Sequence, residues 1–188
     1  MTQTPDRPLT TWSRVVMNQA CRALVRDLPH TRFNTLEISG RKWQDMGFGR
    51  YSSVAYPDFD LCHQTLDERF DLIIAEQVFE HLLYPYRAGR HVLEMLQPGG
   101  YFLISVPFLV KIHDFPIDCT RWTELGLKHF LEECGFPLAS IKTGAWGNRA
   151  CIIANFDDWV MYDPDKHDLT HEPDFPYHVW ALAQRALP

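Results

Sequence analysis

The stretch RFDLIIAE, residues 69–76, decides how this sequence folds, because a continuous apolar run of this kind is typical of strands inside parallel sheets. The amphipathic segment YRAGRHVLEML at 86–96 predicts a helix, which QPGG ends before the next strand. Three other segments have the composition of strands: FNTLEIS at 33–39, YSSVAYP at 51–57 and YFLISVP at 101–107. This alternation predicts a doubly wound α/β sheet with helices on both faces, whose ligands bind outside the carboxyl ends of the strands.

The rest of the chain continues the alternation. Helices are expected to begin at Ser13, Thr123 and Asn148, because Ser, Thr and Asn side chains cap the first turn of a helix. The remaining segments are expected as strands, at 138–146 and 177–185. The pattern therefore gives one α/β domain over residues 1–188, with a helix in the N-terminal segment 1–32.

Composition and charge narrow the class of protein. The chain has 188 residues and is 46% hydrophobic, which is enough for a real core. Its net charge of −6 argues against a nucleic-acid partner, because such binding depends on clustered Lys and Arg. Five scattered cysteines without a CxxC pair indicate neither a disulfide framework nor a zinc–thiolate site. With no apolar leader and no run approaching the ~20 residues of a membrane span, we expect a cytoplasmic protein without membrane contact.

Four motifs resemble, in the right order, those of class I S-adenosylmethionine-dependent methyltransferases. They are LEISG at 36–40, YPDFD at 56–60, FDLIIAEQVFEHL at 70–82 and LEMLQPGGYFLISVPF at 93–108. The resemblance covers about residues 33–136 and implies a mostly parallel, Rossmann-like sheet whose last strand runs antiparallel. It also implies S-adenosyl-L-methionine as the cofactor.

The chain departs from the family in two places. Gly40 is the only glycine of its loop, and Ser39 and Arg41 replace the usual neighbouring pattern. Little chain is left between YPDFD and RFDLI for a separate third strand. The sequence looks like a trimmed variant of the family.

The resemblance places the cofactor at the ends of three strands. Glu37 would lie near the methionine end or order the loop, and Gly40 would admit the methionyl chain. Asp58 would accept hydrogen bonds from the ribose hydroxyls, whereas Asp60 could line the adenine or simply cap a turn. The full predicted cofactor set is Glu37, Ser39, Gly40, Tyr56, Asp58, Asp60, Cys62, Ala75, Glu76 and Gln77.

A long irregular loop, residues 107–122, follows the strand YFLISVP and is expected to bind the substrate. His113, with an ordinary pKa of about 6.5, suits a general base for a hydroxyl or amine acceptor. Asp114 or Asp118 could orient it, and Asp118 is the second catalytic candidate. Arg121 could hold an anionic group, or it could form a loop-stabilising ion pair with Asp118.

No metal is expected. His113, Asp118 and Cys119 lie close in the sequence, but their spacing without a third His resembles no common metal site.

The acceptor is expected to be a small molecule or a glycan. Phe108, Trp146 and Arg149 are predicted to line its pocket together with Arg121, and residues 161–176 to fold over it as a lid-like segment. Methylation of a protein or peptide side chain is the alternative acceptor. A catalytically silent scaffold of the same fold is the alternative function, and a homo-oligomer stays open.

Overall fold

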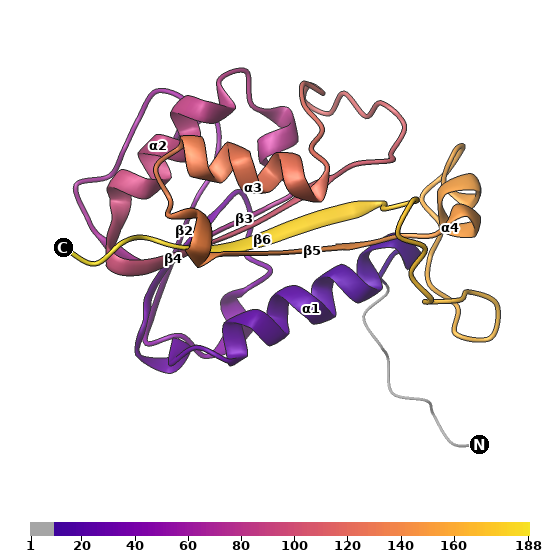
Figure 1. The fold of residues 1–188 in the computed structure, drawn as a ribbon, viewed down its shortest axis with the longest axis horizontal. Helices are drawn as coiled ribbons and strands as arrows, with labels where there is room; N and C mark the ends of the chain where they lie inside the picture. Colours follow the sequence, from indigo (N-terminus) through magenta and orange to yellow (C-terminus); the bar gives the residue numbers. More distant parts are fainter. Residues whose placement is uncertain (1–9) are drawn as a thin grey trace.

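The chain forms a six-stranded mixed sheet with the strand order β2-β1-β3-β4-β6-β5 (Figure 1). The structure is a computed structural model and describes residues 10–188. Strands β1 to β4 run parallel, and β6 is antiparallel to both β4 and β5. The predicted doubly wound, mostly parallel sheet with an antiparallel last strand is confirmed. The strands are β1 (Asn34–Ile38), β2 (Arg50–Val54), β3 (Phe70–Glu76), β4 (Leu96–Pro107), β5 (Ile141–Trp146) and β6 (His178–Gln184).

Helices cover both faces of the sheet (Figure 1). α1 (Val15–Arg26) lies on one face, and α2 (Pro85–Met95) and α3 (Glu124–Glu133) lie on the other. The short α4 (Arg149–Ala154) follows the carboxyl end of β5. Residues 1–9 of the predicted N-terminal segment lie outside the described residues. Short 3-10 turns complete the chain: η1 (Trp12–Arg14), η2 (His30–Arg32), η3 (Gln44–Met46), η4 (Phe79–His81) and η5 (Leu138–Ser140).

The position of β3 in the sheet explains its apolar sequence. β3 pairs with β1 on one edge and with β4 on the other, so both of its faces are covered. Ile73 and Ala75 enter the core layer beneath α2 and α3, whereas Leu72 and Ile74 enter the layer beneath α1. All four side chains are fully buried. A strand buried on both faces needs apolar residues throughout rather than an alternating pattern.

Two of the three predicted helix caps are confirmed. Thr123 Oγ1 accepts a hydrogen bond from the Gly126 N–H at 3.0 Å, and Asn148 Oδ1 accepts one from the Cys151 N–H at 2.7 Å. The prediction that Ser13 caps a helix is wrong. Ser13 lies within η1, and α1 begins two residues later without a side-chain cap.

Two boundaries differ from the sequence prediction. β4 begins at Leu96, because QPGG continues as strand: the Gly99 N–H donates to the Arg185 carbonyl at 3.2 Å. The sequence NRACIIANFDDWV at 148–160 has the pattern of one longer helix, but α4 ends at Ala154. The reason lies in Asn155, whose side-chain amide donates to the Cys151 carbonyl and competes with further helical turns.

Within residues 10–188, β2 is the outermost strand at its edge of the sheet. Residues 55–69, all of them described, connect β2 to β3 without a further strand, as their short length predicts. Among the helices of residues 10–188, none is long and apolar enough to cross a bilayer.

The Thr123 cap gives a stability prediction. Thr123→Ala removes the acceptor for the Gly126 N–H, so we expect the free energy of unfolding in urea to fall by about 1 kcal/mol. Thr123→Ser keeps the hydroxyl and is the matched control, with a much smaller loss. Equal losses in the two variants would show that the methyl group, not the cap, stabilises α3.

Candidate functional site

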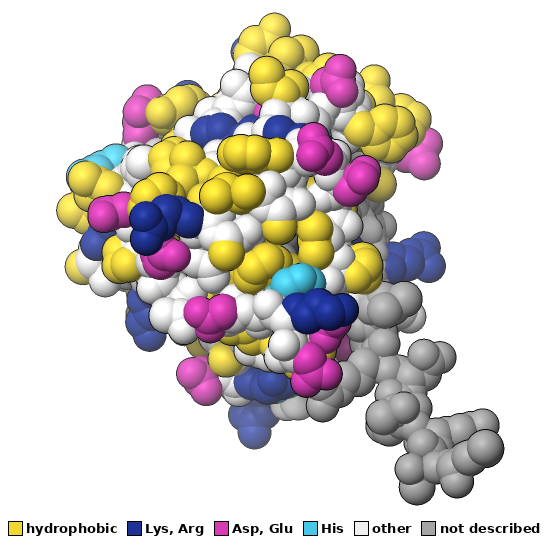
Figure 2. All heavy atoms as spheres, turned by 90° about the vertical axis from the view of Figure 1, so that its right-hand side faces the viewer, with side chains coloured by type: hydrophobic (Ala, Val, Ile, Leu, Met, Phe, Trp, Pro, Cys, Tyr) yellow, Lys and Arg dark blue, Asp and Glu magenta, His cyan; other side chains and the backbone are white. Residues whose placement is uncertain are grey.

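The carboxyl ends of the four parallel strands meet at one end of the sheet, on the right in Figure 1. Figure 2 faces this end of the molecule. Two hollows open there. The first cavity, of about 520 Å³, lies at the ends of β1 and β2 and is lined by Gly40, Ser53 and Asp58 among others. The second cavity, of about 330 Å³, lies at the ends of β3 and β4 and reaches the start of β6.

The loop after β1 forms one wall of the first cavity. Ser39 and Gly40 have positive φ angles of 64° and 144°, so the backbone turns sharply as it leaves the strand. A β-carbon at Gly40 would lie 2.9 Å from Glu37 Oε1, which explains why only glycine fits there. The Ser53 hydroxyl also donates to the Gly40 carbonyl and ties the loop to β2.

Glu37 holds this loop in place. Its carboxylate is buried and accepts hydrogen bonds from the Lys42 and Trp43 N–H groups, each at 3.0 Å, and from the Tyr51 hydroxyl at 2.7 Å. Burial and the Glu37 carboxylate together raise the pKa of Tyr51, which keeps its hydroxyl a donor. Of the two roles predicted for Glu37, the structure supports the ordering of the loop.

The residues of the motif YPDFD and of the turn after it, which follow β2, differ in whether they reach the first cavity. Asp58 lines the first cavity. Asp60 instead caps a turn: its carboxylate accepts from the Cys62 N–H at 2.8 Å and contacts His63 Nδ1 at 2.9 Å. Tyr56 is 75% exposed and is not among the residues that line either cavity, and Cys62 is buried in the core.

At the end of β3, Glu76 joins three parts of the chain. Its carboxylate accepts from Arg14, Lys42 and Trp43 Nε1 at 3.0 to 3.1 Å, and so links η1 and the loop after β1 to β3. Gln77 lines the second cavity, where its amide lies 3.3 Å from the Ser105 hydroxyl. Ala75 is fully buried in the core, so its side chain does not reach a cavity.

The second cavity gathers ionisable side chains from distant parts of the sequence. Glu80, His81, His113 and His178 all line it. Neither Glu80 oxygen and neither His178 ring nitrogen has a hydrogen-bond partner among residues 10–188, although both side chains are buried. Burial raises the pKa of Glu80 to about 7 and lowers the pKa of His178 well below its ordinary value.

The predicted substrate loop places His113 in this cavity. The His113 ring lies 5.1 Å from the His81 ring and 5.9 Å from the Trp159 ring, centre to centre, and burial lowers the pKa of His113. Asp118 does not contact the ring: it accepts from the His113 backbone N–H at 2.9 Å. The predicted orientation of the imidazole by Asp118 is therefore wrong, because that carboxylate serves the loop backbone.

Arg121 forms the ion pair that the sequence left as an alternative. Both of its terminal nitrogens bind the Asp118 carboxylate. Burial alone would raise the pKa of Asp118, but the Arg121 and His113 hydrogen bonds outweigh it and lower the pKa. Arg121 thus stabilises the loop that carries His113.

Three further predicted substrate residues lie away from the second cavity. Trp146 is only 2% exposed and packs in the core, where its indole donates to the Leu169 carbonyl at 2.9 Å. Arg149 is exposed and pairs with Glu172 at 2.7 Å. Phe108 packs against the core beneath α2 and α3.

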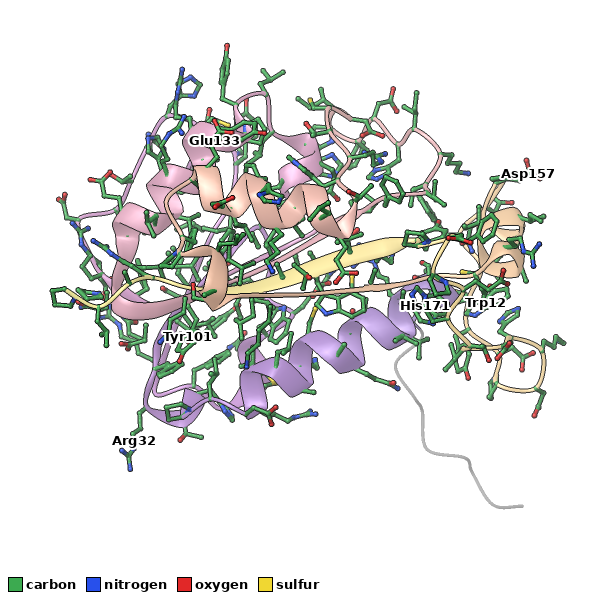
Figure 3. All side chains as sticks on the ribbon, viewed as in Figure 1. Trp12, Arg32, Tyr101, Glu133, Asp157 and His171 are labelled. Atoms are coloured by element: carbon green, nitrogen blue, oxygen red, sulfur yellow. The ribbon has the colours of Figure 1, made fainter. Side chains whose placement is uncertain are left out.

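The predicted lid-like segment, residues 161–176, is bonded to its neighbours. Asn148 donates to the Asp168 and Thr170 carbonyls, and Trp12 Nε1 donates to the Asp168 carbonyl at 2.9 Å. Trp12 and His171 lie at the same end of the molecule (Figure 3). The segment therefore packs beside η1 and the start of α4.

A family model described as a methyltransferase domain matches residues 14–140. The chain belongs to this family. It is an S-adenosylmethionine-dependent methyltransferase, and its cofactor is S-adenosyl-L-methionine.

Solved structures share the fold of this methyltransferase at low sequence identity. An S-adenosylmethionine-dependent methyltransferase from Thermotoga maritima has a TM-score of 0.61 at 13% identity, over 93% of this chain and 91% of that one. One from Mesorhizobium loti has a TM-score of 0.61 at 16% identity, over 93% and 100%. Phosphoethanolamine N-methyltransferase 2 from Haemonchus contortus, in complex with S-adenosyl-L-methionine, has a TM-score of 0.57 at 13% identity, over 90% and 52%. No curated protein matches the chain in sequence.

Among the residues that line the second cavity of the methyltransferase, the sequence prediction missed the charged group of Arg14, the ionisable side chains of Glu80, His81 and His178, and the indole of Trp159. The adjacent residues Glu80 and His81 in FEHL could have indicated the site, because two side chains that can bind protons or ligands follow closely after the end of a strand. His178 had no such signal, since it is the first residue of an ordinary apolar strand. Only the antiparallel pairing of β6 with β4 brings it to this cavity.

The buried His178 gives the methyltransferase a predictable pH dependence. Its pKa is lowered in the folded state, so below pH ~6.5 the unfolded chain binds a proton that the folded chain does not. Stability from this residue is thus present above that pH and is lost as the pH falls. The free energy of unfolding is measured in urea at several pH values below ~6.5. We expect it to rise with pH more steeply in the wild type than in His178→Gln, by up to about 1.4 kcal/mol per pH unit. Parallel slopes would contradict a buried neutral imidazole.

Proposed function

We propose that this methyltransferase transfers a methyl group to an oxygen or nitrogen of a small-molecule or glycan-type acceptor that binds in the second cavity. The observation that carries the proposal is the second cavity itself. It lies beside the first cavity at the ends of neighbouring strands, and its volume of about 330 Å³ suits a small ligand. Its floor carries ionisable groups that can manage an acceptor proton.

The residues of the first cavity fit S-adenosylmethionine. When bound, this cofactor supplies a methyl group already activated by its sulfonium. Gly40 lines this cavity beside the Glu37-ordered loop, and Asp58 offers a carboxylate to a ribose. The chain's main task is then to position the two reactants, which can lower the barrier by up to about 7 to 11 kcal/mol.

His113 is the proposed general base for an acceptor that must lose a proton. Burial lowers its pKa, so the ring is neutral near pH 7 and can accept a proton. Asp118 and Arg121 hold the backbone of residues 107–122, and through it they position His113. In this proposal His113 is the catalytic residue, and Asp118 is a positioning residue.

The rim of the second cavity supports an acceptor with a ring or apolar body. Trp159 is 47% exposed and lines the cavity, and its indole face can stack on an aromatic or sugar ring. Phe115 and Ile112 on the same loop as His113 are also exposed. Hydrophobic side chains are visible in several patches at this end of the molecule (Figure 2).

Two experiments separate the candidate functions. Calorimetry with S-adenosylmethionine and S-adenosylhomocysteine tests the enzyme against the silent scaffold: no binding of either at sub-millimolar concentration would favour the scaffold. Methyl transfer from labelled cofactor to pools of phenols, alcohols, amines and oligosaccharides, with peptides as a parallel pool, then tests the acceptor class. Transfer to peptides alone would replace the small-molecule proposal with the side-chain alternative.

The Asp58 carboxylate is expected to contribute to cofactor binding. Asp58→Ala should weaken S-adenosylhomocysteine binding in calorimetry by about 1.5 to 3 kcal/mol, the usual worth of hydrogen bonds to a charged group. Asp60→Ala is the matched control, because the Asp60 carboxylate is used by the Cys62 N–H and His63. A larger loss in Asp60→Ala would move the ribose contact to that residue.

His113→Ala is expected to lower turnover by about 10²- to 10⁴-fold for an acceptor that must lose a proton, with unchanged S-adenosylhomocysteine affinity. His129→Ala, which removes an exposed histidine of α3 outside both cavities, is the control. The measurement is kcat and KM for the identified acceptor. A raised KM with unchanged kcat, together with faster proteolysis of residues 107–122, would show that His113 only stabilises the loop.

A further inference from the structure

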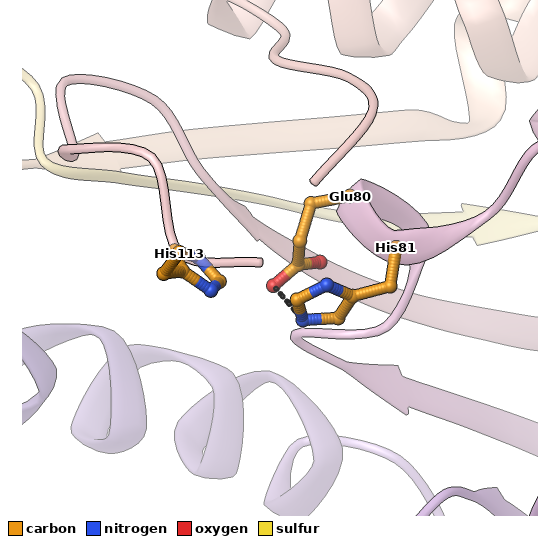
Figure 4. Close-up of side chains that lie close together, drawn as sticks. All are labelled: Glu80, His81 and His113. Atoms are coloured by element: carbon orange, nitrogen blue, oxygen red, sulfur yellow. Dashed lines mark ion pairs between the residues drawn. The ribbon is translucent and has the colours of Figure 1, made fainter. Parts of the chain in front are cut away.

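Glu80, His81 and His113 bring three metal-ligating groups together at the floor of the second cavity. One ligand atom from each lies within 4.8 Å of the other two. Figure 4 shows the Glu80 carboxylate between the two imidazoles. Glu80 and His81 belong to η4, which follows β3, and His113 lies in the loop after β4. Because β3 and β4 are neighbours, the two segments leave the sheet side by side.

The Glu80 carboxylate lacks the partners that a buried carboxylate requires. Its side chain is 0% exposed, and neither oxygen accepts a hydrogen bond within the described chain. His81 Nε2 lies 3.6 Å from Oε1, which is too long for a hydrogen bond. An unpaired buried carboxylate costs several kcal/mol, and a bound cation is one way to remove that cost.

His81 is already oriented as a metal ligand. Its Nδ1 lies 2.5 Å from the Ile117 carbonyl oxygen. Since a carbonyl can only accept, Nδ1 carries the hydrogen, and in the neutral ring the lone pair is left on Nε2, which faces Glu80. Ligating histidines are held in this way by a carbonyl or carboxylate behind the ring.

The loop that carries His113 is fixed by outer contacts. The Glu80 carbonyl accepts from the Cys119 N–H at 2.8 Å, which ties the loop to η4. Asp118 binds the His113 backbone N–H and is itself held by Arg121. The three ligating side chains therefore sit on segments bonded to one another.

We infer that Glu80, His81 and His113 bind one divalent first-row transition-metal ion. Two imidazoles and one carboxylate suit Zn²⁺, Co²⁺, Fe²⁺ or Mn²⁺ better than Mg²⁺ or Ca²⁺, which prefer oxygen ligands. Three protein ligands leave positions open toward the cavity, as in catalytic rather than structural metal sites. The prediction from sequence that no metal binds is thereby replaced by a specific site.

The ion would take part in the methyl transfer proposed above. This catalytic role rests on the proposed function, whereas metal binding does not. It would coordinate a hydroxyl oxygen of the acceptor and stabilise its deprotonated form, and the released proton would pass to water. The methyl carbon–sulfur bond would then break as the carbon–acceptor bond forms, with no change in the oxidation state of the ion. His113 would act as a ligand in this case rather than as the base.

Metal titration of the full 188-residue chain tests the site without cofactor or acceptor. After removal of metals with EDTA, we expect one equivalent of Zn²⁺ to bind in calorimetry, and Co²⁺ to give visible absorption bands of a site with nitrogen and oxygen ligands. Excess Mg²⁺ should not displace either ion. Glu80→Gln, His81→Gln and His113→Gln should each weaken binding by more than the roughly 10- to 100-fold that loss of an outer-shell partner causes.

His129→Ala is the matched control, because His129 and Glu132 form an exposed imidazole–carboxylate pair that has no third ligating group beside it in the described part of the chain. Its binding should equal that of the wild type. No saturable binding in the wild type, or equal binding in a Glu80→Gln/His81→Gln double variant, would overturn the inference. Circular dichroism checks that each variant folds, and His81→Gln and His113→Gln decide the question if Glu80→Gln does not fold. Metal binding without methyl transfer would reject only the proposed function, whereas EDTA-resistant transfer without metal binding would reject only the site.

Discussion

The carboxyl end of β3 is the point from which both cavities are built, because this strand is paired on both edges and buried on both faces. Its register with β1 places Ala75 opposite Ile38, so the loop after β1 and the residues after β3 start at the same level. Its register with β4 places Glu76 opposite Ser105, so the residues after β3 and the loop after β4 also start at the same level. A shift of one residue in either pairing would turn the side chains of a whole strand to the other face.

The loops after β1 and β4 are both held by a carboxylate that accepts hydrogen bonds from backbone N–H groups. Glu37 accepts from two backbone N–H groups after β1, and Asp118 accepts from the His113 N–H after β4. Each carboxylate also has a side-chain partner, Tyr51 in one case and Arg121 in the other. Loops fixed in this way keep ligand-binding groups in place without regular secondary structure.

Glu80 differs from these two carboxylates. It is buried like Glu37, but its oxygens have no partner within residues 10–188. Buried polar groups are almost always hydrogen-bonded, so a carboxylate and an imidazole left unpaired in one cavity indicate a place where a ligand completes the structure. Glu76 lies nearby at the end of β3 and is fully engaged by Arg14, Lys42 and Trp43. The two acidic residues thus have opposite roles: Glu76 joins elements of the fold, whereas Glu80 faces the cavity.

The sequence by itself determined the order and type of the elements, because apolar runs, caps and glycines act locally. It predicted β3 from its uninterrupted apolar residues and α3 from Thr123. It also predicted that the short connection between β2 and β3 holds no further strand. The tertiary structure alone decided which side chains share a cavity. Trp146 turned inward, where its indole donates to the Leu169 carbonyl from a distant part of the sequence. Asp118 turned toward the backbone of its own loop, where it accepts from the His113 N–H. Glu80, His81 and His113 meet because β3 and β4 are neighbours, and His178 joins them because β6 returns antiparallel beside β4. Strand order is a long-range property that no local pattern encodes.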